Sequence, residues 1–413
     1  MTIEHKTATL DNGLFITAEV DPDAHTAACG FFVRTGTRDE NPVDMGVSHF
    51  LEHMMFKGTD TRSAEDVNRE FDEVGASNNA FTSQEMTAFY AHVLPAVFPR
   101  TLGILADIMR PTLRDTDFQD ERGVILEEIA MYDDQPFWRL YEKTMEVHYE
   151  NHPLAMRVLG TVDSIRELKR ERMVGYFNQR YSADNTALAI AGRVDFDDVV
   201  DRADQFCGQW KRTNTARTYP ELQLDCNDFT LEDERTNRHY LIMISPAPAL
   251  QDDRRYAASM LANLIGDNEG SILYWALVDP GLAEEAQAGY DGRDALGDMF
   301  VYASCSPDRA EQVEEIINDR LDRCLALITD DDLERLRSKT ATNITVGSER
   351  PLGRMMRLGR MAMYYGEEYR TLDEELARIE AVTLDDLRGV YEAFPFTPRT
   401  VGRLRPANHH PEN

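Results

Sequence analysis

The 413-residue sequence has few cysteines and no long apolar segment. Its cysteines are odd in number, widely spaced and without a C-x-x-C pair, a pattern typical of reduced thiols in the cytoplasm; they are Cys29, Cys207, Cys226, Cys305 and Cys324. No run of about eighteen apolar residues occurs, so no membrane-spanning helix is expected. The first residues lead into a strand pattern without the apolar core of a signal peptide. We therefore expect a cytoplasmic protein.

Basic residues are also scarce. The sequence has 44 Lys and Arg against 74 Asp and Glu, which gives a net charge of −30. A chain of this charge is not expected to bind nucleic acid or anionic membranes. The acidic residues have two explanations that the sequence leaves open. The first is that they line a cavity that attracts cationic peptides. The second is that they cover a surface adapted to solubility or salt.

Residues 46–59 carry the most informative pattern, GVSHFLEHMMFKGT. His49 and His53 are four residues apart, so on a helix they share one face, and Glu52 lies on that face too. Two neutral imidazoles at this spacing can bind one zinc ion and leave a position for water. The neighbouring carboxylate can accept a proton from that water. This H-x-x-E-H order is the inverzincin motif, the reverse of H-E-x-x-H. Two ordinary histidines on an amphipathic helix are the alternative, but a buried glutamate beside them needs a cation.

A third zinc ligand is expected from a helix further along the chain. Glu121 and Glu128 are seven residues apart, which is two helical turns, so they project from one face. Val124, Ile125 and Ile129 lie beside them. Acidic residues in so charged a helix ordinarily form a solvated face. The apolar neighbours favour instead a pair of acids that face a cation.

These motifs resemble the M16 family (pitrilysin, insulysin and mitochondrial processing peptidase), most closely its shorter bacterial members. The family pattern places a ligating glutamate well downstream of H-x-x-E-H, with another glutamate seven residues before it. Glu128 matches the ligand and Glu121 the earlier acid. Glu127 is the adjacent alternative, but the seven-residue spacing from Glu121 favours Glu128. The resemblance covers nearly the whole chain, including the residues Gly58-Thr59 and Asn79-Ala80-Phe81-Thr82.

The resemblance implies a zinc-dependent endopeptidase that hydrolyses peptides or unfolded polypeptide segments. One zinc ion per chain is expected, and the implied ligands are His49, His53 and Glu128. Glu52 and Glu121 are the implied catalytic residues. Glu52 activates the zinc-bound water, and Glu121 orients a ligand or helps a proton to move.

The family also implies where the substrate binds. A short strand of Asn79, Ala80 and Phe81 would take the peptide backbone by β-addition. An ordinary edge strand is the alternative. Longer family members carry an Arg and a Tyr in the second half that contact the peptide carbonyl. A rough alignment places Met299 at the first position and Ser306 or Pro307 near the second, so neither role is carried over. Their neighbours Arg309 and Tyr302 are possible substitutes.

Two domains are expected, because strand and helix signals occur in the same order in both halves. The predicted ranges are 1–212 for an N-terminal catalytic zinc-binding domain, 213–235 for a linker and the first strand of the second domain, and 236–413 for a C-terminal non-catalytic domain. Where H-x-x-E-H should recur, residues 260–264 read MLANL and hold no ligand. The predicted fold class is α+β. Each domain has a mixed, largely antiparallel sheet covered by helices, and the two domains are degenerate repeats.

A partner chain follows from the resemblance, since short family members close their chamber with two chains. A homodimer and a heterodimer with an M16-like relative both remain open. A different class of function is a non-catalytic M16 subunit that serves as a scaffold or captures substrate in a heterodimer. The complete motif favours catalysis. Zinc storage is disfavoured, because it gives Glu52 no role.

Overall fold

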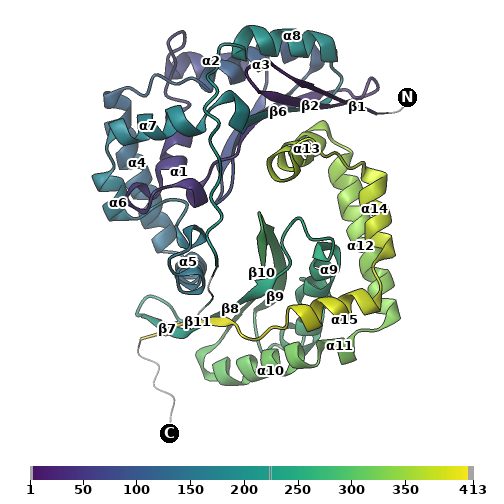
Figure 1. Cartoon of the computed structure of the whole chain (residues 1–413). Helices are drawn as coiled ribbons and strands as arrows, with labels where there is room; N and C mark the ends of the chain where they lie inside the picture. The colour runs from purple at the N-terminus through teal and green to yellow at the C-terminus, as the bar shows by residue number, and fades with distance from the viewer. Residues whose placement is uncertain (1–2, 223, 225, 408–413) are drawn as a thin grey trace. The chain divides into compact units, whose positions relative to one another are not determined.

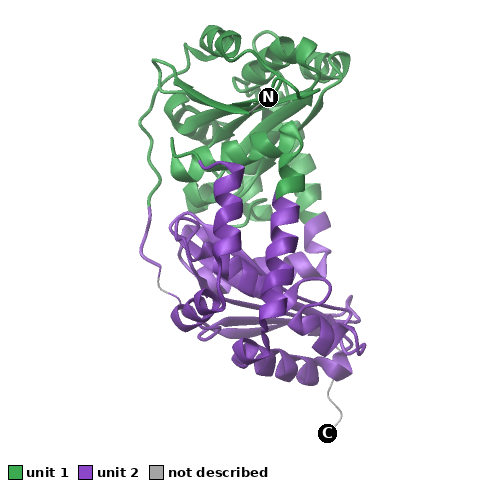
Figure 2. Cartoon of the chain, turned by 90° about the vertical axis from the view of Figure 1, so that its right-hand side faces the viewer, with its two compact units in different colours: residues 1–130, 156–218, 345–369 green, residues 131–155, 219–344, 370–413 purple. Residues whose placement is uncertain are grey.

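The computed structural model describes residues 3–222, 224 and 226–407, which form two compact units. The first unit comprises Met1–Ala130, Met156–Thr218 and Thr345–Tyr369, and the second comprises Met131–Ala155, Tyr219–Ile344 and Arg370–Asn413 (Figure 2). Each unit has one mixed sheet with helices against it, which confirms the predicted two-domain α+β class. No helix of the described residues is both long and apolar enough to cross a membrane.

The predicted domain ranges differ from these units at two segments. The chain passes to the second unit between Thr218 and Tyr219, inside the predicted linker. However, residues 131–155 pack with the second unit and residues 345–369 with the first, the reverse of the sequence order. An apolar helix face shows that a helix covers a sheet, but it does not specify which sheet. The predicted ranges also include residues 1–2, 223, 225 and 408–413, which lie outside the described residues.

The sheet of the first unit has six strands in the order β1-β2-β6-β3-β5-β4. The strands are β1 (Glu4–Thr9), β2 (Phe15–Val20), β3 (Ala27–Val33), β4 (Ser77–Thr82), β5 (Thr87–Val93) and β6 (Thr186–Gly192). β6 runs parallel to β2, and the other pairs are antiparallel. β3 and β6 are wholly buried, as expected for central strands. β4 forms one edge of the sheet, so no strand of the described residues lies beside its outer backbone groups.

Helices cover both faces of this sheet. α3 and α8 lie on one face and α13 on the other (Figure 1). The helices of the first unit are α1 (Val47–Met54), α2 (Ala64–Glu73), α3 (Phe98–Ile108), α6 (Val162–Glu167), α7 (Arg170–Arg180), α8 (Phe196–Cys207) and α13 (Pro351–Tyr365), with most of α4 (Asp115–Asp133). Gly359 of α13 lies directly against Phe32 of β3, where a Cβ atom would come within 2.2 Å of the ring. α13, which follows the second unit's strands in sequence but belongs to the first unit, is therefore closely packed on the first sheet.

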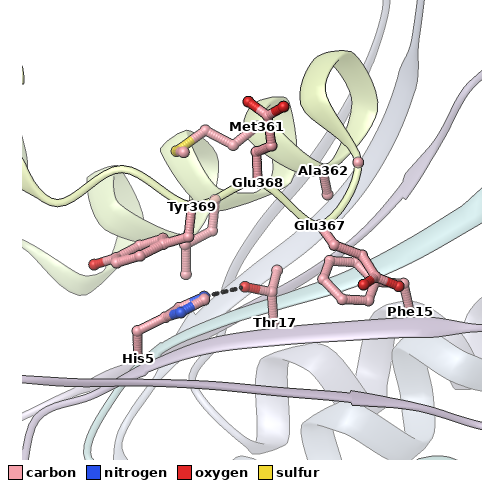
Figure 3. A pocket seen from close by; sticks show the side chains of 10 residues that line it. His5, Phe15, Thr17, Met361, Ala362, Glu367, Glu368 and Tyr369 are labelled. Carbon is pink, nitrogen blue, oxygen red and sulfur yellow. Dashed lines mark hydrogen bonds between the residues drawn. The ribbon is translucent and has the colours of Figure 1, made fainter.

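Side chains of residues 345–369 also bind the first sheet, near the end of that segment. His5 of β1 stacks on Tyr369 with ring centroids 3.6 Å apart, and its Nε2 lies 3.0 Å from Thr17 Oγ1 on β2 (Figure 3). The Tyr369 hydroxyl donates to Glu19 at 2.9 Å, and Arg357 pairs with the same carboxylate. These contacts hold residues 345–369 in the first unit.

The second unit has a five-stranded sheet in the order β7-β11-β8-β10-β9. Its strands are β7 (Asp228–Asp233), β8 (His239–Ala247), β9 (Glu285–Arg293), β10 (Leu296–Cys305) and β11 (Thr400–Pro406). β11 runs parallel to β7 and antiparallel to β8. Its helices are α5 (Pro136–Tyr149), α9 (Arg255–Gly266), α10 (Ala310–Asp322), α11 (Cys324–Leu327), α14 (Leu372–Ala381) and α15 (Leu384–Ala393), with most of α12 (Asp330–Ser348). α5 packs on β8 and β11, on the side opposite α10 (Figure 1).

Candidate metal centre

The helix that carries the H-x-x-E-H motif, α1, begins at a left-handed glycine. Gly46 has φ 92°, and a Cβ atom there would lie 2.8 Å from the Leu159 carbonyl oxygen. The backbone N–H groups of Gly46 and Ser48 each donate to the Glu40 carboxylate at 2.7 Å. Burial nevertheless raises the pKa of Glu40 to about 7, against the effect of these hydrogen bonds. The N-terminus of α1 is thus fixed by a buried acid.

Aromatic packing brings α1 against α4. Phe50 of α1 and Phe118 of α4 are fully buried and stack with ring centroids 4.7 Å apart, nearly parallel. Leu51 and Met54 bury further faces of α1. The histidines are left facing the side of α4 that carries the two glutamates.

His49, His53 and Glu128 converge on one point. Glu128 Oε2 lies 3.7 Å from His49 Nε2 and 3.6 Å from His53 Nε2, and all three ligand atoms lie within 4.8 Å of one another. Over residues 3–222, 224 and 226–407, no other group of three His, Cys, Asp or Glu side chains has this geometry. The separations are too long for hydrogen bonds. The two separations between Glu128 and the imidazoles are close to the ~3.4 Å expected between tetrahedral ligands whose bonds to zinc are about 2.0–2.1 Å long. The donor set therefore fits a zinc ion.

The surroundings of the two histidines shift their pKa values in opposite directions. Burial, reinforced by the neighbouring His53, lowers the pKa of His49 to about 3, so His49 is neutral and can offer a lone pair. Burial alone would lower the pKa of His53 as well. The hydrogen bond and charge of Glu121, with the charges of Glu128 and Glu52, outweigh burial and raise it. Three carboxylates thus surround His53, an arrangement that a bound cation would balance.

Glu121 orients His53. This carboxylate is buried, with Oε1 2.8 Å from His53 Nδ1 and Oε2 2.5 Å from Lys57 Nζ. Burial raises the pKa of Glu121, but its hydrogen bonds to His53 and Lys57 outweigh burial and lower it. An ionised acceptor at Nδ1 selects the tautomer of His53 that leaves the Nε2 lone pair free for a metal. Sequence reasoning singled out Glu121 but missed Lys57, which lies three residues beyond the end of α1.

Glu52 lies beside this group and is held by a residue that sequence reasoning did not assign. Thr82, the last residue of β4, donates from Oγ1 to Glu52 Oε2 at 2.6 Å. Burial raises the pKa of Glu52, and the Thr82 hydrogen bond and the nearby His53 act in the opposite direction. Glu52 and Thr82 are thirty positions apart, so no local sequence pattern predicts their contact.

The predicted substrate strand lies at the edge of the sheet, next to α1. Asn79, Ala80 and Phe81 form the middle of β4, which pairs with β5 and packs against α1. Asn79 is exposed, whereas Ala80 and Phe81 are half-buried. In the second unit, Tyr302 is buried edge-to-face against Phe137. Nothing in that unit resembles the donor set of α1 and α4 within the described residues.

The fold and the donor set together define a two-domain α+β protein with a candidate zinc site. Two family models match the chain: Insulinase (Peptidase family M16) over residues 15–162 and Peptidase M16 inactive domain over residues 167–340. The chain belongs to peptidase family M16, which confirms the resemblance noted in the sequence.

Curated relatives match along most of the chain. A Streptomyces coelicolor protein named as an uncharacterized zinc protease is 32% identical over 399 residues, which cover 92% of this chain and 85% of that protein. The uncharacterized zinc protease YmxG of Bacillus subtilis is 28% identical over 388 residues, which cover 93% of this chain and 94% of YmxG. The chain is thus similar to zinc proteases over both units.

Solved structures share the fold. The crystal structure of a protease from Helicobacter pylori aligns with a TM-score of 0.92 at 20% identity and covers 98% of this chain and 100% of that one. A peptidase M16 inactive domain structure from Pseudomonas fluorescens aligns with a TM-score of 0.90 at 16% identity, covering 98% and 99%. At these identities the comparison shows the architecture alone.

Proposed function

We propose that this chain is a zinc-dependent endopeptidase of the inverted H-x-x-E-H type, which hydrolyses peptides or unfolded polypeptide segments. The observation that carries the proposal is the convergence of His49 and His53 of α1 with Glu128 of α4 within 4.8 Å, beside Glu52 of α1. Similarity to proteins named as zinc proteases supports the choice of metal. One zinc ion per chain is proposed.

His49 Nε2, His53 Nε2 and a Glu128 oxygen are the proposed ligands. A bound zinc ion would supply Lewis-acid activation of a water molecule and of the scissile carbonyl group. The role of the chain is to hold these three donors at the separations described above. Glu121 keeps His53 in the ligating tautomer, and Lys57 keeps Glu121 in place.

Glu52 is the proposed general base. With Oε2 held by Thr82, its other oxygen, Oε1, accepts the proton of the attacking water and returns it to the leaving amine. Partial burial keeps bulk water from competing for this carboxylate, and the raised pKa strengthens it as a base.

The edge strand β4 is the proposed substrate site. A peptide that adds beside Asn79, Ala80 and Phe81 would form main-chain hydrogen bonds with backbone groups that face no other strand in the described part of the chain. Main-chain recognition is independent of side chains, so it suits an enzyme for extended or unfolded segments. The negative net charge favours cationic segments among these.

A dimer in the cytoplasm is the proposed working state, with the partner either an identical chain or an M16-like relative. The proposal includes no nucleic-acid or membrane partner. A non-catalytic subunit that captures substrate in a heterodimer is the competing function. The complete set of Glu52, His49, His53 and Glu128 argues against it, since such a subunit has no use for a base beside the metal.

The substitution Glu52→Gln tests the proposal. Turnover of a quenched-fluorescence unstructured peptide should fall by about 10²–10⁴-fold, the usual contribution of a general base. Zinc content, measured by mass spectrometry of the metal, should stay at one per chain. Undiminished turnover would remove Glu52 from the reaction. A zinc-loaded, dimeric wild type that cleaves no peptide of a diverse library would instead support the subunit function.

A further inference from the structure

We propose that Thr82 is a positioning residue of the hydrolytic reaction, which fixes the Glu52 carboxylate relative to the substrate strand. This inference rests on the proposed function. The Thr82 hydroxyl donates to Glu52 Oε2 at 2.6 Å, within the short range of hydrogen bonds to ionised carboxylates. A β-branched side chain has few χ1 rotamers, so the donor is held stiffly.

The turn that follows Thr82 is fixed by close backbone contacts. Gly36 approaches it so closely that a Cβ atom there would lie 2.3 Å from the Ser83 carbonyl oxygen. The Arg38 backbone N–H donates to the Gln84 carbonyl at 2.8 Å. The Ser83 hydroxyl donates to the Met86 carbonyl at 3.0 Å. The turn therefore has little freedom to move.

Two buried ion pairs also hold this turn. Arg38 pairs with Glu85 at 2.5 Å, and the two side chains are 1% and 4% exposed. Arg217, which pairs with Asp39 at 2.7 Å, also donates to the Glu85 carbonyl. Tyr364 of α13 donates to the Glu85 carboxylate at 3.0 Å. Since breaking a buried pair leaves an uncompensated charge, displacement of this turn is strongly opposed.

Thr82 thus connects the proposed base to the proposed substrate strand. Asn79, Ala80 and Phe81 precede it directly on β4, so a peptide docked on that edge and the carboxylate of Glu52 share one rigid support. The register of the peptide and the position of the base are then set by the same strand. A displacement of about 1 Å at such a site can reduce a rate by 10²-fold.

The test compares Thr82→Val, which keeps the shape and removes the donor, with Thr82→Ser, which keeps the donor. Thr87→Val is the matched control, because Thr87 pairs with Thr82 across the hairpin but donates to the Thr35 carbonyl instead. Thr82→Ala serves as a second deletion if the valine variant folds poorly. The measurements are kcat, KM, bound zinc, and the affinity of zinc-free protein for a fluorescent unstructured peptide.

We expect Thr82→Val to lower kcat by about 10- to 100-fold with KM, zinc content and peptide affinity unchanged, and Thr82→Ser to recover most of the loss. In a Glu52→Gln background, Thr82→Val should have no further effect on kcat, because the group it positions is gone. Thr87→Val should keep kcat within twofold.

Several outcomes would overturn the inference while the wild type remains active. These are an unchanged kcat for Thr82→Val, a weakened peptide affinity that accounts for the loss, or an equal loss in Thr87→Val. A wild type without activity would contradict the proposed function itself, so the two failures are distinguishable.

Discussion

Substituting Gly359 by alanine tests whether α13 covers the first sheet. A Cβ atom at this position would lie 2.2–2.4 Å from three ring atoms of Phe32, which is fully buried on β3. Overpacking of a core costs about 1–3 kcal/mol, and a contact this short falls at the upper end. Replacing a helical glycine by alanine gains about 1 kcal/mol in helix propensity. The net loss of stability should be roughly 2 kcal/mol, from these two opposing terms.

Gly175→Ala in α7 is the matched control, since an added Cβ would meet no described atom within 4 Å apart from its chain neighbours and the backbone of its own helix. It should stabilise the first unit by about 0.5–1 kcal/mol. A chain with two units need not unfold in one step, so the assay is native-state hydrogen exchange, which reports each sheet separately. The opening free energy of β3 and β6 amides should fall in Gly359→Ala and that of β8 and β10 should not. Loss of protection confined to β8 and β10 would show that residues 345–369 do not pack on the first sheet.

Two further predictions concern buried acids. Glu40 has a pKa raised from 4.5 to about 7, so its contribution to stability is full below pH 4.5 and is lost as the pH rises through 7. The difference in opening free energy between wild type and Glu40→Gln, measured by hydrogen exchange of the β3 and β6 amides, should therefore shrink by roughly 3 kcal/mol from about pH 4.5 to pH 8, and a constant difference would contradict this. Arg217→Met removes the nearer of two arginines that pair with Asp39, from a pair 2% and 1% exposed, and leaves Arg180 at 3.6 Å; it should destabilise the first unit by about 2 kcal/mol. Arg212→Met, whose side chain is 57% exposed, should change stability by less than about 0.5 kcal/mol, and equal effects would show that Asp39 does not depend on Arg217.

Much of the candidate site could be predicted because its spacing is local. His49 and His53 share a face of α1 through a four-residue step, and Glu121 and Glu128 share a face of α4 through a seven-residue step. Helical geometry alone fixes these relations. The pairing of α1 with α4 came from the family resemblance, and the structure supplies its physical basis in the stacking of Phe50 on Phe118.

The features that sequence reasoning missed depend on contacts between distant segments. Thr82 reaches Glu52 only because the hairpin of β4 and β5 packs beside α1. Lys57, just after the end of α1, reaches Glu121 of α4. The sequence also did not show that α5 packs on the second sheet and α13 on the first. An amphipathic pattern defines which face of a helix is buried, but many sheets of similar composition can accept that face.

The proposed metal centre is tested most directly by measuring bound zinc in Glu128→Gln and Glu127→Gln side by side. The two glutamates are adjacent, but Glu127 is exposed, and it is Glu128 that lies within 3.7 Å of both imidazole Nε2 atoms. We predict one zinc per chain in wild type and Glu127→Gln after dialysis against buffered zinc. Glu128→Gln should lose affinity by more than the 10- to 100-fold seen for groups that only orient a ligand. Full zinc occupancy in Glu128→Gln, or its loss in Glu127→Gln, would contradict the proposed metal centre.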